Sequence, residues 1–136
     1  ALEACGLEYD QSLVRYGDFN SRSGYQQMRQ LILSGAEFTA VFAASDEVAY
    51  GVNAALVEQN MRPPEKVALV GFDDLPMSAY FDPPLTTVRV PATELARRAG
   101  NLLVQILEGD RRDQRVQLLE THLIVRHSCE MKKTAL

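Results

Sequence analysis

FTAVFAASDE, residues 38–47, and VALVGFDD, residues 67–74, decide the fold of this 136-residue chain. Each stretch is an apolar run of strand length that ends abruptly in acidic residues. A continuous apolar run is typical of a strand covered on both faces, as in a parallel sheet. We therefore expect residues 38–44 and 67–72 to form buried parallel strands.

The segments on either side of these runs alternate between strand and helix patterns. Helical spacing of apolar residues predicts helices over residues 21–33, after residue 45, and over residues 91–107. Short strands are expected at residues 12–16, 86–90 and 121–125, with a loop at 75–84 that contains one helical turn and a charged loop at 110–115. The helix at 91–107 is expected to bury Leu95, Ala99, Leu102, Leu103 and Ile106. This alternation is typical of an α/β fold built on a parallel sheet.

The composition is that of one ordinary globular domain, with 46% hydrophobic and 24% charged residues. Fourteen basic residues face 18 acidic ones, and the net charge of −4 argues against nucleic-acid binding by this stretch itself. No apolar run reaches the roughly 20 residues of a membrane span, and the N-terminus does not resemble a secretory signal. A cytoplasmic location without a membrane partner is therefore expected.

Cysteine and histidine do not form a metal-binding pattern. Cys5 and Cys129 stand at opposite ends of the chain, and free thiols are favoured over the disulfide that remains formally possible. His122 and His127 are five residues apart in a strand-like segment, which places them on opposite faces. We expect neither a metal nor another cofactor.

The predicted strand ends bring together acidic and polar residues with one aromatic ring. In open parallel sheets, ligands bind at the carboxyl ends of the strands. Those ends carry Phe19 after Gly17-Asp18, then Ser45 and Asp46, and then Asp73-Asp74. A phosphate loop, a GxSxG elbow and a Cys/His nucleophile pair are all missing, so no catalytic residue is predicted. A carboxylate beside an aromatic face is how small polyols and nucleobases are held.

Structural roles compete with ligand binding at these positions. Asp46 is more typical of a first-turn acid than of a ligand contact, and Ser45 is compatible with a simple helix cap. Phe19 is equally compatible with a core position, and one of the two aspartates could start an Asx turn. A metal-dependent enzyme or a phosphorylated receiver domain is a further alternative, but the acidic pair comes too late in the chain for a receiver.

Three segments carry a specific resemblance. FTAVFAASDEVAYGVNAAL, RPPEKVALVGFDDLPMSAYFDPPLTTVRVPATELARRAGNLLVQILEG and LIVRHSC together resemble the C-terminal part of the lactose-repressor/galactose-repressor (LacI/GalR) family of bacterial transcription regulators. GDFNSRSGYQQM resembles the segment that precedes them in that family. The combination of GFDD with DPPLTTVR at this distance is specific, and the likeness covers nearly the whole chain.

The resemblance implies a two-lobed, periplasmic-binding-protein-like effector domain with the ligand in the cleft between the lobes. Residues 1–90 would form the C-terminal lobe, residues 91–118 would belong to the N-terminal lobe, and residues 119–136 would return to the C-terminal one. The DNA-binding helix-turn-helix lies outside this sequence. The implied partners are a sugar-like effector, operator DNA bound through that absent domain, and a second copy of the protein.

The resemblance also assigns roles to single residues. Phe19 is expected to stack on the effector and Asp73 to hydrogen-bond it, with Ser45 at a position where sugar-binding relatives often carry Asn. Tyr50, Ala54 and Tyr80 are expected at the dimer interface. A solute-binding protein of a sugar importer shares this fold and is the main competing interpretation.

Overall fold

The computed structural model describes residues 2–109 and 116–129, and it confirms the α/β class. The helices and strands are α1 (Ser21–Leu33), β1 (Ala40–Phe42), α2 (Asp46–Glu58), β2 (Ala68–Val70), β3 (Thr87–Arg89), α3 (Ala92–Leu107) and β4 (His122–Ile124). Short 3₁₀ turns cover Glu3–Cys5 (η1), Gln11–Leu13 (η2), Pro76–Ala79 (η3) and His127–Cys129 (η4). None of the helices in this part of the chain has the length and apolarity needed to cross a membrane.

The strands are predominantly parallel, as predicted. β1 pairs in parallel with β2, with Val41 opposite Leu69. Parallel bridges between Val70 and Thr86 and between Asp73 and Arg89 place the next strand beside β2. β4 joins β3 from the other side in the antiparallel direction. β1, β2 and the β3 segment thus run parallel, and their carboxyl ends lie at one edge of the sheet.

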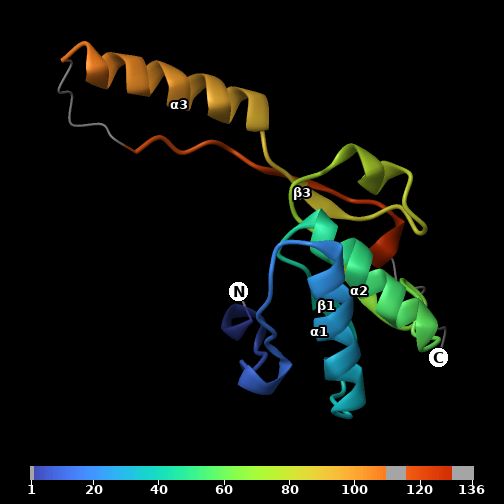
Figure 1. The fold of residues 1–136 in the computed structure, drawn as a ribbon. Helices are drawn as coiled ribbons and strands as arrows, with labels where there is room; N and C mark the ends of the chain where they lie inside the picture. Colours follow the sequence, from blue (N-terminus) through green and yellow to red (C-terminus); the bar gives the residue numbers. More distant parts are fainter. Residues whose placement is uncertain (1, 110–115, 130–136) are drawn as a thin grey trace.

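The helices α1 and α2 pack closely against each other and begin at the same end of the molecule (Figure 1). A Cβ atom added at Gly51 would stand 1.8 Å from the carbonyl oxygen of Ser21, so the two backbones are in direct contact. The Ser21 hydroxyl donates to Glu47 at 2.8 Å, which ties the first turns together. The buried core lies between this helix pair and the strands: Met28, Leu31, Ala43, Ala49, Val52, Ala55, Leu56, Val67, Leu69 and Leu85.

The helix α3 projects away from the rest of the structure (Figure 1). Its helical bounds agree with the prediction, but the prediction that its apolar stripe is buried was wrong. None of its residues is buried, and Leu103 is 57% exposed. Since the stripe is real in the sequence, it needs a partner surface that residues 2–109 and 116–129 do not supply.

Two strand predictions also fail, each for a local reason. Residues 12–16 are not a strand, because the Asp10 side chain accepts a hydrogen bond from the Ser12 N–H at 2.8 Å and starts the turn η2. The run at 38–44 shortens to β1, and it is not covered on both faces, since Phe42 remains 67% exposed. The predicted loop at 110–115 lies outside the described residues.

Candidate functional site

The loop after β2 carries the acidic pair Asp73-Asp74 in an unusual backbone conformation. Asp73 has φ 114° and Asp74 has φ 56°, both in the positive region that residues other than glycine rarely adopt. The Asp73 N–H donates to the carbonyl of Val88 at 2.9 Å, which joins the loop to the third strand. The loop is therefore held by the sheet edge itself, with two carboxylates on a strained turn.

Asp73 presents a carboxylate without a hydrogen-bond donor from the described part of the chain. The side chain is half-buried, and burial together with the nearby charge of Asp46 raises its pKa above the usual value. A partly desolvated carboxylate beside another acid gains from any donor that reaches it. Asp73 is thus available to a ligand.

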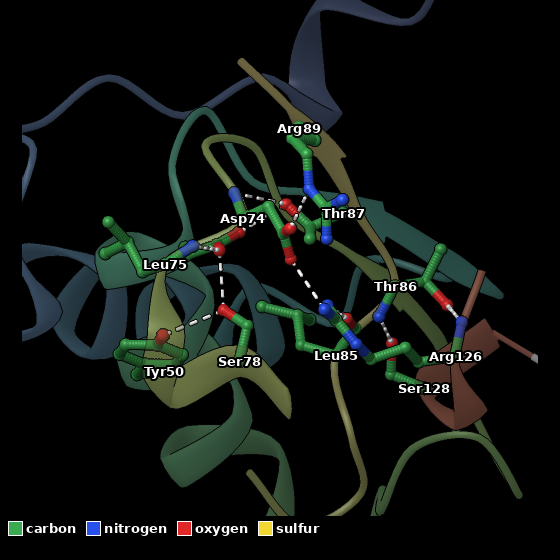
Figure 2. Close-up of polar contacts among 11 residues, drawn as sticks. Tyr50, Asp74, Leu75, Ser78, Leu85, Thr86, Thr87, Arg89, Arg126 and Ser128 are labelled. Carbon is green, nitrogen blue, oxygen red and sulfur yellow. Dashed lines mark hydrogen bonds and ion pairs between the residues drawn. The ribbon is translucent and has the colours of Figure 1, made fainter. Parts of the chain in front are cut away.

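Asp74, in contrast, forms ion pairs within the protein. Its side chain is 6% exposed and bonds to Arg89 and to Arg126, each at 2.6 Å (Figure 2). Burial raises the pKa of Asp74, but the hydrogen bonds and charges of the two arginines outweigh burial and hold it below the usual value. Asp74 therefore anchors the loop, whereas the half-buried carboxylate of Asp73 has no such partner among the described residues.

Asp46 lies beneath this loop at the first turn of α2. It is fully buried and accepts hydrogen bonds from the Leu75 N–H at 2.8 Å, from the Ser78 hydroxyl at 2.5 Å and from the Thr87 hydroxyl at 2.6 Å. Ser45 before it is also buried, and its hydroxyl accepts from the Val48 N–H at 3.2 Å. Ser45 is therefore the N-cap of α2, which was the structural alternative to effector binding, and its hydroxyl is used in that cap.

Two residues of the C-terminal segment, Arg126 and Ser128, also bond to this edge of the sheet, and the sequence patterns did not single them out. The Ser128 hydroxyl accepts from the Thr86 N–H at 2.8 Å (Figure 2). It also donates to the Leu69 carbonyl at 2.6 Å. Arg126 donates to the Leu85 carbonyl at 2.8 Å as well as to Asp74. No pattern marks these residues, because their partners are more than 40 positions away in the sequence.

Phe19 stands at the same end of the molecule, in the turn that precedes α1. Its ring is 72% exposed, so the core alternative for this residue is wrong. The ring lines a cavity of about 330 Å³ between the N-terminal segment, α1 and β1, with Tyr16, Met28 and Phe42 among its other walls. Asp73 is not among the lining residues. This cavity is therefore not the shared pocket that was predicted for Phe19 and Asp73.

The three predicted interface residues lie on α2 and around η3. Tyr80 is 86% exposed and Ala54 is exposed. Tyr50 is half-buried, because its hydroxyl shares a hydrogen bond of 2.8 Å with Ser78 and its ring packs 4.8 Å from that of Phe81 (Figure 2). Tyr50 thus fixes η3 to α2 and places Tyr80 on the surface beside it.

A metal centre finds no support in the described ranges 2–109 and 116–129, where no three potential ligand side chains gather. Cys5 and Cys129 are both free thiols, and Cys5 is exposed.

Comparison with known proteins gives the same fold and a family. The model of the periplasmic binding protein-like domain matches residues 1–129. The HTH-type transcriptional regulator CelR of Thermobifida fusca is 41% identical over 128 residues, which cover 94% of this chain and 38% of CelR.

Two solved structures place the likeness in three dimensions. The complex of the regulator CelR with cellobiose has a TM-score of 0.88 at 41% identity, covering 93% of this chain and 39% of that one. The lac repressor dimer bound to operator and the anti-inducer ONPF has a TM-score of 0.82 at 30% identity, covering 94% and 44%. This chain spans less than half the length of these relatives. It belongs to the periplasmic-binding-protein-like family and corresponds to the effector-binding part of the LacI-type transcription regulators.

Proposed function

We propose that this chain is the effector-binding part of a LacI/GalR-type transcription regulator, and that its effector is a small polar molecule of the sugar class. The effector binds between the lobe described here and a second lobe, and favours one relative orientation of the two. A dimer passes that orientation to DNA-binding domains at the operator. A ligand shifts such an equilibrium only by the difference between its affinities for the two states. The protein catalyses no reaction and acts in the cytoplasm.

The carboxylate of Asp73 carries this proposal. It is half-buried, lacks a donor among the described residues and has a raised pKa. Two hydroxyl groups of a polyol would supply the missing hydrogen bonds, and hydrogen bonds to a charged acceptor are stronger than neutral ones. The adjacent Asp74 is held by two arginines, so the loop needs no rearrangement before an effector arrives.

Phe19 is proposed to supply apolar contact area for the same molecule, although the cavity that Phe19 lines does not include Asp73. A phenyl ring with 72% of its surface exposed contributes little to the core, whereas an aromatic face packs well on the C–H face of a sugar. CelR, whose complex contains cellobiose, and the lac repressor, whose complex contains operator, are both regulators. That agreement favours a regulator over a solute-binding protein of an importer.

The homodimer is proposed to form through the surface of Tyr50, Ala54 and Tyr80. Exposed aromatic side chains are typical anchors of protein interfaces, and Tyr80 is 86% exposed next to Met77 at 60%. Residues 1–90 and 119–136 are proposed to form one lobe and residues 91–118 to pack on the other. The exposed apolar stripe of α3 supports that division.

Calorimetric titration of the full-length protein with a panel of mono- and disaccharides that includes cellobiose tests the effector assignment. Asp73→Asn is expected to weaken binding by roughly tenfold or more, and Phe19→Ala by roughly three- to tenfold. Asp10→Asn, an exposed aspartate at the turn η2, is the matched control and should bind like wild type. Unchanged affinity in Asp73→Asn would reject its role, and a panel without any binder would reject the sugar class.

A further inference from the structure

The carboxylate of Asp46 is buried without any basic partner in the described ranges. Its residue is 0% exposed, and its three hydrogen bonds all come from neutral donors. Burying a carboxylate is costly even when it is hydrogen-bonded, and buried charges seldom increase stability over a well-packed apolar residue. This arrangement therefore points to a role in fixing one conformation.

The hydrogen bonds of Asp46 surround the loop that presents Asp73. The Asp46 N–H donates to the carbonyl of Phe72 at 2.7 Å, just before the acidic pair. The Asp46 carboxylate accepts from the Leu75 N–H at 2.8 Å, just after the pair. The hydroxyls of Ser78 and Thr87 bring η3 and β3 to the same carboxylate. Both sides of the loop are thus attached to the first residue of α2.

The loop at residues 72–75 has a backbone conformation that needs support from the residues around it. Two successive residues other than glycine have positive φ, at 114° and 56°. Backbone in such regions persists only where the surroundings fix it, and it is concentrated at functional sites. The Asp46 carboxylate also packs directly against the backbone at the end of β2, because a Cβ added at Gly71 would stand 2.3 Å from its Oδ1.

We infer that Asp46 is the positioning residue of the effector site: it holds the loop at residues 72–75, and with it the half-buried carboxylate of Asp73, while touching no effector itself. The inference rests on the proposed function, since it concerns the same site. Full burial excludes direct contact between Asp46 and a ligand in the cleft.

The charged groups around Asp73 make this role measurable. Asp46 faces it from α2, Asp74 is its neighbour in the loop, and the backbone of Arg89 lies opposite it in a parallel bridge. Arg89 and Arg126 are both bonded to Asp74. Burial and the negative charge of Asp46 raise the pKa of Asp73. Removing the charge of Asp46 should therefore lower the pKa of Asp73, and loss of the hold on the loop is read separately from the Leu75 amide, which donates to Asp46.

Two variants of the full-length protein separate the effect of the Asp46 charge from the effect of its hydrogen bonds to the loop. Asp46→Asn keeps the shape and an acceptor for Leu75 and Ser78, but removes the charge. Asp46→Ala removes the acceptor as well. Glu47→Gln is the matched control. It removes one negative charge from the next residue of α2, which is exposed and bonds to Ser21 and not to the loop. The titration of Asp73 is followed by NMR on protein labelled with ¹³C-aspartate, without any ligand, and the Leu75 amide by hydrogen exchange.

In Asp46→Asn the pKa of Asp73 should fall, while Glu47→Gln matches wild type. In Asp46→Ala the Leu75 amide should exchange at least roughly tenfold faster, and cellobiose affinity should drop by a similar factor. An Asp73 pKa and a Leu75 exchange rate that both stay at wild-type values in Asp46→Asn and Asp46→Ala would overturn the inference. If Asp46→Ala does not fold, a wild-type pKa of Asp73 in Asp46→Asn overturns it alone.

Failure of the proposed function has a different signature. If Asp73→Asn leaves sugar binding unchanged while Asp46→Asn still lowers the pKa of Asp73, then the effector role of Asp73 is wrong. The holding of the loop by Asp46 would stand in that case. If Asp73→Asn abolishes binding but neither Asp46 variant changes the loop, the proposed function stands and the positioning role falls.

Discussion

Replacing Ser128 with alanine removes a hydroxyl that joins two strands through a side chain. Its oxygen accepts from the Thr86 N–H at 2.8 Å and donates to the Leu69 carbonyl at 2.6 Å, and the residue is 1% exposed. The alanine variant leaves one buried N–H and one buried carbonyl without this partner. Each buried polar group left unsatisfied costs about 1–3 kcal/mol, so for the two groups together we expect a loss of roughly 2–6 kcal/mol.

Urea unfolding of the full-length protein, followed by far-ultraviolet circular dichroism, measures this loss as a change in the free energy of unfolding. Ser34→Ala is the matched control. Its hydroxyl donates to the Leu31 carbonyl at 2.7 Å, but the residue is exposed and water can replace it. We expect the control to lose less than about 1 kcal/mol. Equal losses in the two variants would refute the idea that Ser128 links β2 to the following strand.

Three further outcomes follow from the geometry. Gly51→Ala places a methyl group 1.8 Å from the Ser21 carbonyl oxygen, so α1 and α2 must separate. The same urea titration should show a loss of about 3 kcal/mol or more, and a neutral variant would contradict this close packing. The lowered pKa of Asp74 means that its contribution to stability is present above its unfolded pKa of about 3.9 and is lost as the pH falls toward its folded pKa. The difference in stability between wild type and Asp74→Asn should therefore shrink from about pH 6 to pH 3, and a constant difference would argue against the ion pairs. Leu103→Cys, made in a Cys5→Ser background, should react with iodoacetamide more slowly in the full-length protein than in this 136-residue chain, and equal rates would contradict a partner surface for α3.

Local signals in the sequence predicted most of the fold. The helix at 21–33 has the predicted bounds, and its start is fixed by the Asn20 side chain, which accepts from the Ser23 N–H at 2.9 Å. Ser45 caps α2 in the same way. These elements are predictable because their start signals lie within three residues of the groups that they satisfy. Residues 12–16 were mispredicted because the Asp10 cap, an equally local signal, outweighs the weak strand pattern there.

The candidate site was only partly predictable. Asp73 and Asp74 were found from their place at a strand end, but nothing in the sequence separates the carboxylate that lacks a partner among the described residues from the one that is anchored. That distinction depends on Arg126, which is 52 positions away and makes Asp74 the anchored partner. Asp46 was correctly placed as a first-turn acid, yet its three donors come from segments 29 to 41 residues further on. Such contacts are set by the tertiary arrangement, which residue spacing does not encode.

The helix α3 also shows what residue spacing can and cannot predict. Its apolar stripe was predicted from periodicity, and the helix forms where expected, but periodicity specifies only that a face is apolar and not what covers it. The strand β3, which leads into this helix, ends at Arg89, opposite His122 of β4, and the Arg89 side chain also bonds to Asp74. The segment that carries α3 is therefore joined to the loop of Asp73 through the ion pair between Arg89 and Asp74. The two acidic residues thus have different roles: Asp73 is the proposed effector ligand, and Asp74 holds Arg89 of β3 and Arg126 beyond β4.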